Sequence, residues 1–141
     1  MEDILLLEPE VEKEYPLLGA RVQSTFIDLL FIVLLMFIFG TLLEQVGEVP
    51  DGVRIGLFVF VWIVYEPLFT TLGATVGNYI KGIRVRQHYN TKRRLPFHKA
   101  LLRYLVKFFL GWVSFLTIHT NKERRAIHDL LSGSVMTFRE K

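Results

Sequence analysis

The sequence FIDLLFIVLLMFIFGTLL, residues 26–43, contains a single ionisable side chain, Asp28. An α-helix of these 18 residues would be roughly 27 Å long, close to the apolar thickness of a bilayer, about 30 Å. The stretch therefore predicts a membrane-spanning helix. A carboxylate about one turn inside such a helix is costly unless other groups compensate its charge, so Asp28 is a candidate functional residue.

Two further apolar runs, residues 53–72 and 100–118, hold most of the remaining hydrophobic side chains. The concentration of apolar residues in three continuous runs predicts an all-α membrane protein. In it, residues 26–43 and 53–72 form two full transmembrane helices and residues 100–118 form a third hydrophobic helix. A length of 141 residues corresponds to a single domain. The sequence has no cysteine, which excludes disulfides, thiol catalysis and cysteine-ligated metals.

Lysine and arginine are distributed unevenly between the loops. Residues 44–52 contain neither, whereas residues 73–99 are rich in both, so the positive-inside rule predicts that the second loop is cytoplasmic. The acidic N-terminal segment, residues 1–25, is then also cytoplasmic, and we expect a bacterial plasma (inner) membrane protein. Contact with anionic lipid headgroups is a simpler explanation of the basic loop than nucleic-acid binding, and it involves Lys81, Arg84, Arg86, Lys92, Arg93 and Arg94.

The third hydrophobic segment has two interpretations. A full span would place the basic C-terminal segment, residues 119–141, outside the cell, against the charge rule. Arg103 and Lys107 also lie in its first half, one helical turn apart. A re-entrant helix that bends near Gly111 or Trp112 and packs on protein would tolerate these cations better. Both a re-entrant and a spanning segment remain open at this point.

Short alternating segments predict a small cytoplasmic β element outside the bilayer. They lie near residues 4–7, 82–89 and 134–139, and short strands need partners to be stable. Residues 121–131 between the last two are expected to form an amphipathic helix on the membrane surface, capped by Asn121 and ended by Gly133.

Four ionisable residues are expected at similar depth in the inner half of the bilayer: Asp28, Glu66, Arg103 and Lys107. They could form ion pairs that hold the helices together, or a site or path for protons or small cations. In the second case Glu66 is the expected titrating group, because Pro67 next to it should kink or end the helix and free backbone carbonyls.

A set of spaced residues resembles the RDD family of small integral membrane proteins, which is named for one Arg and two Asp. The set, which extends over roughly residues 15–138, comprises Arg21-x6-Asp28, Thr75-x-Gly77, Gly82-x-x-Val85, Arg103 and Arg125-x-x-His128-Asp129-x-x-x-Gly133-Ser134-Val135. The resemblance implies that Arg21, Asp28 and Asp129 are the naming residues, and transport, including cation transport, has been suggested for members. Asn78 departs from the pattern, because a lysine commonly follows Thr-x-Gly.

His128 and Asp129 are expected to bind the loop next to the membrane through hydrogen bonds or salt bridges, with Arg21, Arg84 and Arg125 as candidate partners. The other histidines are scattered, so neither a metal site nor a phosphohydrolase centre is expected. No catalytic set, phosphate-binding glycine loop or cofactor motif is present, and we expect neither an enzyme nor a cofactor.

Two functions therefore remain. The first is small cation or proton-coupled transport through intramembrane carboxylates, as a homo-oligomer, because two or three helices rarely enclose a pathway alone. The second is a non-catalytic membrane scaffold or accessory subunit that recruits a cytoplasmic or membrane partner.

Overall fold

The structure, a computed structural model, describes residues 14–140, so the strand expected at residues 4–7 lies outside the described part. The chain forms mostly helices and one small sheet. In order, its elements are α1 (Leu18–Val46), α2 (Asp51–Leu72), α3 (Val76–Ile80), β1 (Ile83–Gln87), α4 (Phe97–Leu110), the 3-10 helix η1 (Gly111–His119), α5 (Ile127–Ser132) and β2 (Ser134–Phe138).

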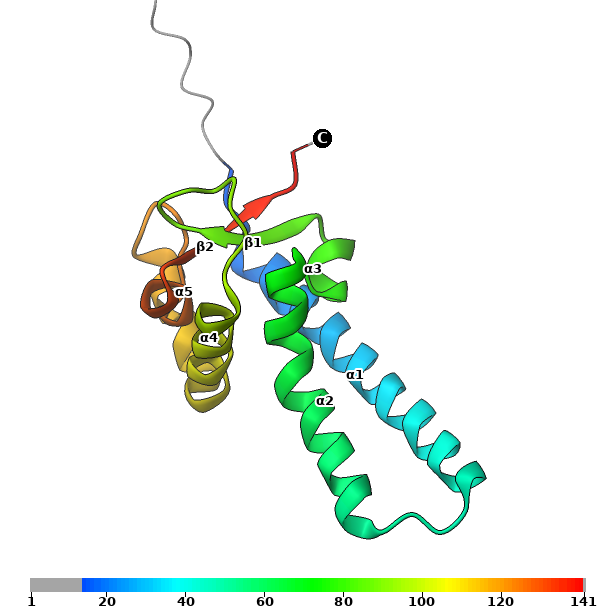
Figure 1. Ribbon diagram of the computed structural model, residues 1–141. Helices are drawn as coiled ribbons and strands as arrows, with labels where there is room; N and C mark the ends of the chain where they lie inside the picture. Colours follow the sequence, from blue (N-terminus) through cyan, green and yellow to red (C-terminus); the bar gives the residue numbers. More distant parts are fainter. Residues whose placement is uncertain (1–13, 141) are drawn as a thin grey trace, which may run out of the picture.

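Helices α1 and α2 form a long antiparallel hairpin whose connecting loop lies at the end of the molecule opposite the two strands (Figure 1). Both are long and apolar enough to cross a bilayer, as the sequence predicted. Helix α1 begins at Leu18 rather than at residue 26, because the polar side chains of its first turns are buried against protein. Pro67 does not end α2, which continues to Leu72.

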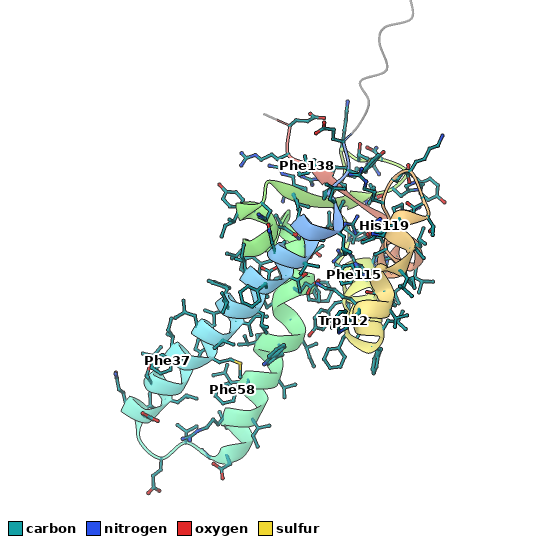
Figure 2. The ribbon with its side chains drawn as sticks, turned by 180° about the vertical axis from the view of Figure 1, so that it is seen from behind. Phe37, Phe58, Trp112, Phe115, His119 and Phe138 are labelled. Atoms are coloured by element: carbon teal, nitrogen blue, oxygen red, sulfur yellow. The ribbon has the colours of Figure 1, made fainter. Side chains whose placement is uncertain are left out.

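Most apolar side chains of the hairpin point outward. Phe37 is 70% exposed, and the buried residues of α1 are mainly polar. Figure 2 shows Phe37 and Phe58 towards the loop end of the hairpin, away from the rest of the fold. Because outward-facing apolar surface of this extent is stable only in hydrocarbon, and because three segments have spanning length and composition, the chain is an integral membrane protein.

The third hydrophobic segment folds as a hairpin of its own. Helix α4 ends at Gly111, whose φ of 52° and ψ of −125° reverse the chain, and η1 then returns beside α4. In Figure 2, Trp112, Phe115 and His119 lie successively closer to Phe138 of β2. Although residues Phe97–His119 have the length and composition of a span, α4 alone is about 21 Å long and the chain reverses its direction after it. The structure thus favours the re-entrant alternative.

The β element lies at one end of the molecule, which we call the β end. Strands β1 and β2 pair antiparallel, with Ile83 opposite Phe138 and Gln87 opposite Ser134, close to the two strands expected from the sequence. The described chain begins and ends near this side, and at its start the Arg124 guanidinium donates to the Tyr15 carbonyl at 2.7 Å. The two ends of the described chain therefore lie at the same end of the molecule (Figure 1).

The amphipathic helix expected at residues 121–131 begins only at Ile127, in α5. Asn121 does not cap it; its Oδ1 instead accepts the Arg125 amide at 2.8 Å and closes a loop. His128 and Asp129 on the polar face of α5 are buried, whereas Leu131 on its apolar face is 59% exposed. The polar face turns inward because charged partners on other helices bind it. Gly133 ends α5 in the left-handed region, at φ 64°.

Candidate functional site

Arg21 connects the first helix to the last. Its side chain is almost completely buried, and its Nη1 lies 2.6 Å from Asp129 Oδ2 on α5. Its Nη2 donates to the Arg124 carbonyl in the loop before α5. A charge removed from solvent in this way is stable only if it is paired. The Arg21–Asp129 ion pair therefore holds α1 and α5 together.

Asp129 is the centre of the buried polar interior. Its Oδ1 accepts Arg103 Nε at 3.0 Å, and its Oδ2 also accepts the Ala126 amide at 3.1 Å at the start of α5. Burial alone would raise the pKa of this carboxyl, but the nearby charge of Arg103, and of Arg21 after it, holds the pKa well below its usual range. Asp129 is therefore a permanent anion at neutral pH.

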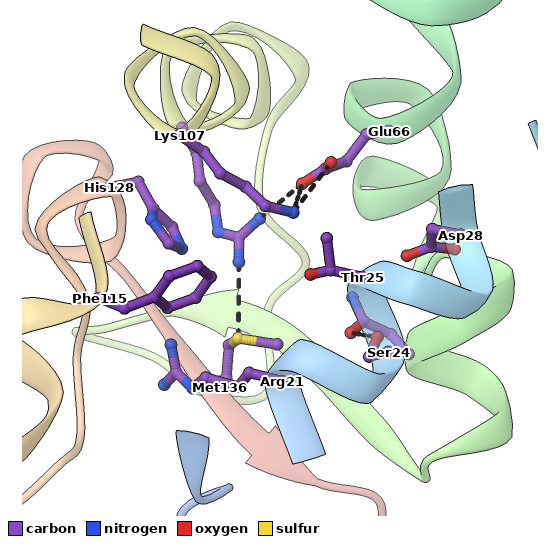
Figure 3. Close-up of a pocket in the computed structure, with 11 residues that line it drawn as sticks. Arg21, Ser24, Thr25, Asp28, Glu66, Lys107, Phe115, His128 and Met136 are labelled. Atoms are coloured by element: carbon purple, nitrogen blue, oxygen red, sulfur yellow. Dashed lines mark hydrogen bonds and ion pairs between the residues drawn. The ribbon is translucent and has the colours of Figure 1, made fainter. Parts of the chain in front are cut away.

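Glu66 on α2 continues the same set of ion pairs. It accepts Arg103 Nη1 at 3.2 Å and Lys107 Nζ at 2.9 and 3.1 Å. Arg103 and Lys107 are four residues apart on α4 and so share one face. The resulting charge network, shown in part in Figure 3, joins α1, α5, α4 and α2 and comprises Arg21, Asp129, Arg103, Glu66 and Lys107.

His128 lies beside the charge network as a neutral ring. It is 1% exposed, its Nδ1 is 3.0 Å from Ser114 Oγ, and the ring packs edge-on against Phe115. Burial, and next the charge of Arg103, lower the pKa of His128 to about 3. Within residues 14–140, no group of three His, Cys, Asp or Glu side chains is placed to hold a metal ion.

Asp28 does not join the other three residues of the expected intramembrane cluster. Its Oδ1 accepts the Tyr65 hydroxyl at 2.8 Å and the Gly77 amide at 2.7 Å, and its Oδ2 accepts the Thr75 hydroxyl at 2.7 Å. All three donors are uncharged, and within residues 14–140 Asp28 forms no ion pair. It is therefore the only buried carboxylate of the described chain without a cationic partner.

The Thr75-x-Gly77 motif positions α3 against α1. Thr75 caps α3 by accepting the Asn78 amide at 3.2 Å, and a Cβ added at Gly77 would overlap the Ser24 carbonyl oxygen. Ser24 Oγ donates to Asn78 Oδ1 at 2.6 Å. Only glycine permits this approach, which brings the Gly77 amide to the Asp28 carboxylate.

A small polar cavity separates Asp28 from the charge network. Its volume is about 10 Å³, close to the smallest space that holds one water molecule. Figure 3 shows Asp28 on one side of it and Glu66, Lys107 and His128 on others. Arg21 also lines the cavity, and its buried Nε has no hydrogen-bond partner within the described residues.

A family model for the RDD family matches residues 15–133, more than four fifths of the chain. The chain belongs to the RDD family. Neither a search of curated proteins nor a search of solved structures finds a match. Of the three residues that the resemblance implied as naming residues, Arg21 and Asp129 bind each other directly in this RDD protein, whereas Asp28 lies on the other side of the cavity.

The remaining residues expected at the site occupy several environments. Among the six basic residues predicted to contact lipid headgroups, Lys92, Arg93 and Arg94 are exposed, and Lys81 and Arg84 are half-buried. Arg86 is only 9% exposed, because it lies within β1. Of the partners proposed for Asp129, Arg21 binds its carboxylate and Arg125 reaches only its backbone carbonyl, at 3.4 Å. Within residues 14–140, Arg84 forms no hydrogen bond or ion pair with it.

Sequence reasoning missed several residues of this RDD site. Tyr65 bridges Asp28 and the Val76 amide, and Ser114 orients His128. A tyrosine directly before Glu66 in an apolar run was a usable signal, since a buried hydroxyl needs a partner. For Ser114 the local sequence offers no such signal, because its partner lies on a separate element.

Proposed function

We propose that this RDD protein moves a proton or a small cation across the membrane, and that Asp28 is the carboxylate that binds it. The observation that carries the proposal is the position of Asp28, a buried carboxylate without a cationic partner beside a cavity of about 10 Å³. Ionisable groups within a membrane are commonly functional, and an exchangeable cation needs a carboxylate that no resident cation occupies. Glu66, which we expected from the sequence to titrate, is paired with two resident cations.

In this proposal the charge network has a structural role: it keeps the helices around the cation path in place. It fixes α4 of the re-entrant hairpin against α2 and α5, and through Asp129 to Arg21 of α1, and so keeps polar groups at membrane depth. One chain encloses only a small cavity, so a second copy would complete the path through the rest of the bilayer. We therefore propose a homo-oligomer as the transporting unit.

We also propose that the β end faces the cytoplasm of a bacterial cell, with the N-terminus on the same side. The support is the charge of the loops: residues 47–50 contain no lysine or arginine, whereas Lys92, Arg93 and Arg94 are exposed at the β end. Each of these cations would contribute about 1 kcal/mol near an anionic lipid surface.

A second function, a non-catalytic scaffold or accessory subunit, is favoured by one specific observation. Glu66 and Asp129 are each paired with two cations, which is the arrangement of a structural interior that exchanges nothing with solvent. In that case the exposed basic loop at the β end would recruit a partner.

Flux through proteoliposomes separates the two functions. We expect wild-type protein to dissipate an imposed proton gradient, read by an internal pH-sensitive dye, or an imposed sodium gradient, read by an internal sodium-sensitive dye. Asp28→Asn should abolish this flux. The substitution is isosteric: the amide oxygen can still accept from Tyr65 and Gly77, and the amide nitrogen can donate to Thr75 Oγ1.

Arg93→Gln, an exposed change at the β end, is the matched control and should retain full flux. Folding of each variant is checked by size-exclusion profile and helical circular dichroism. Wild-type vesicles that leak no faster than protein-free vesicles would refute transport. The scaffold predicts instead that one partner co-purifies with the wild type and is lost when Lys92, Arg93 and Arg94 are changed together to glutamate.

A further inference from the structure

A second, larger depression opens sideways between α1, α2 and the re-entrant hairpin. This lateral groove has a volume of about 1020 Å³ and is bounded by residues of α1, α2, α4 and η1. Several of its residues are strongly exposed, including Phe26 at 59% and Trp112 at 89%. Since these residues belong to membrane-spanning or re-entrant segments, the lateral groove opens towards lipid rather than towards water.

Aromatic rings from all four elements form its walls. They are Phe26, Trp62, Tyr104, Phe108, Trp112 and Phe115. The faces of such rings attract organic cations as well as hydrocarbon, most strongly where water is excluded. Pockets that bind drug-sized ligands have volumes of about 300–1,000 Å³ and combine apolar walls with a few polar groups, which describes this groove.

The charged residues of the lateral groove are Asp28, Glu66 and Lys107. Lys107 pairs with Glu66 at 2.9 and 3.1 Å, and Arg103 pairs with Glu66 at 3.2 Å, so Asp28 is the charged group of this wall that has no ionic partner among the described residues. Arg21 and Arg103 line the small cavity and not the lateral groove. The groove therefore carries a net formal charge of about −1 on its wall, counting each carboxylate as ionised and each ammonium as protonated.

We propose that the lateral groove binds a lipophilic organic cation, a quaternary or delocalised cation with apolar substituents, which enters from the bilayer and directs its charge towards Asp28. A lipid chain could fill the apolar part but would bring no positive charge to a carboxylate whose donors, Tyr65, Thr75 and Gly77, are all uncharged. This binding goes beyond the movement of small cations and does not depend on it.

The two tryptophans of the protein, Trp62 and Trp112, both line the lateral groove, so intrinsic fluorescence reports on its occupancy. The probe is tetraphenylphosphonium, added to the full chain in maltoside micelles, and the comparison is tetraphenylborate, an anion of the same shape. We expect a saturable fluorescence change with the cation and at least tenfold weaker binding of the anion. Equal affinity for the two ions would overturn the proposal, because it would show partition into an apolar surface alone.

Substitutions locate the site. Asp28→Asn should weaken tetraphenylphosphonium binding, measured by equilibrium dialysis, by at least tenfold. Trp112→Ala changes a residue at the rim that belongs to no ion pair, and it should weaken binding several-fold. Phe109→Ala is the matched control, since Phe109 is 80% exposed on α4 and lies outside the lateral groove. It should bind as the wild type does.

Three results would overturn the inference. The first is wild-type affinity for tetraphenylphosphonium in both Asp28→Asn and Trp112→Ala, and the second is a loss of affinity in Phe109→Ala as large as that in Trp112→Ala. The third is an oligomeric wild-type protein that shows no saturable binding of tetraphenylphosphonium, which would indicate that a second copy fills the groove. A protein that binds the probe but shows no proton or sodium flux would refute the transport proposal and leave this one intact.

Discussion

The Arg21 guanidinium and the Asp129 carboxylate, 108 positions apart in the sequence, meet at 2.6 Å inside the protein with 1% and 0% of their side chains exposed. This contact joins the helix that begins the described fold to the short helix that nearly ends it. The remaining pairs of the charge network attach α4 and α2 to the same centre. The polar interior between these helices therefore consists of ion pairs, which lie beside two buried apolar clusters, one around Ile83 and one around Tyr65.

Arg21→Gln should destabilise the protein strongly, by about 3–5 kcal/mol, the usual cost of breaking a buried ion pair, because Asp129 would keep only Arg103 as a cationic partner. The measurement is thermal unfolding in detergent followed by circular dichroism. Arg93→Gln removes an exposed charge of the same type and should leave the midpoint within error. Equal midpoints for the two variants would show that the Arg21 contact contributes little.

Gly77→Ala should destabilise the packing of α3 on α1 by about 1–3 kcal/mol, the usual cost of overfilling a packed site. The added Cβ would overlap backbone at Ser24, which has no room to move without shifting α1. Gly40→Ala is the comparison, because nothing lies within 4 Å of a Cβ there. It should be neutral or slightly stabilising, since alanine favours helix more than glycine does. A Gly77→Ala protein with wild-type thermal stability would contradict the close contact.

Stability should fall as the pH is lowered from about 6.5 towards 3, because of His128. The pKa of His128 is lowered to about 3 in the folded protein, whereas a histidine in the unfolded chain has a pKa near 6.5. Between these two values the unfolded chain binds a proton at His128 and the folded protein does not. The loss is up to about 1.4 kcal/mol per pH unit. Above pH 6.5 the contribution is complete.

The pKa of Asp129 is also lowered, so its contribution is lost only below the unfolded value, about 4, and it does not affect a comparison of pH 7.5 with pH 5. Over that interval, the thermal midpoint of His128→Asn should fall less than that of the wild type. His119→Asn, a change at an exposed ring, should keep the wild-type slope. If the slopes of all three proteins coincide, His128 is not the group that titrates on unfolding.

Single cysteines test the topology cleanly, because the natural sequence has none. Asn90→Cys and Lys122→Cys flank the third segment at exposed positions, and a re-entrant hairpin places both on the same side of the membrane. With the β end inside, a membrane-impermeant maleimide should label neither in intact cells but both after permeabilisation, whereas Glu48→Cys should be labelled without it. Labelling of Lys122→Cys alone in intact cells would establish a full third span.

The spans and the strands could be predicted because each is a local pattern. Residues 26–43 and 53–72 are nearly unbroken apolar runs, and residues 82–89 alternate in the manner of a strand. The early start of α1 and the burial of the polar face of α5 could not be predicted in this way. Both depend on polar side chains, Arg21 and Asp129, that bury themselves because each has the other as a partner.

Part of the candidate site could likewise be predicted from the sequence, and part could not. Similar depth in the bilayer correctly suggested that Glu66, Arg103 and Lys107 would meet, because depth follows from counting along helices. Depth does not determine which side of a helix a residue faces. Asp28 lies where α3 packs on α1, and the donors that reach it come from Tyr65 and from the turn around Gly77, a geometry set by tertiary packing.

The long sequence separation within the Arg21 contact also sets an order of events during synthesis. At about 5–20 residues per second, a ribosome needs roughly 5–20 s after making Arg21 before it has added the aspartate that completes the contact. During that interval the first helix must hold its guanidinium among water and headgroups at the membrane surface. Chains truncated before Asp129 would remain in this unfinished state, which gives cellular quality control a means to distinguish them from finished protein.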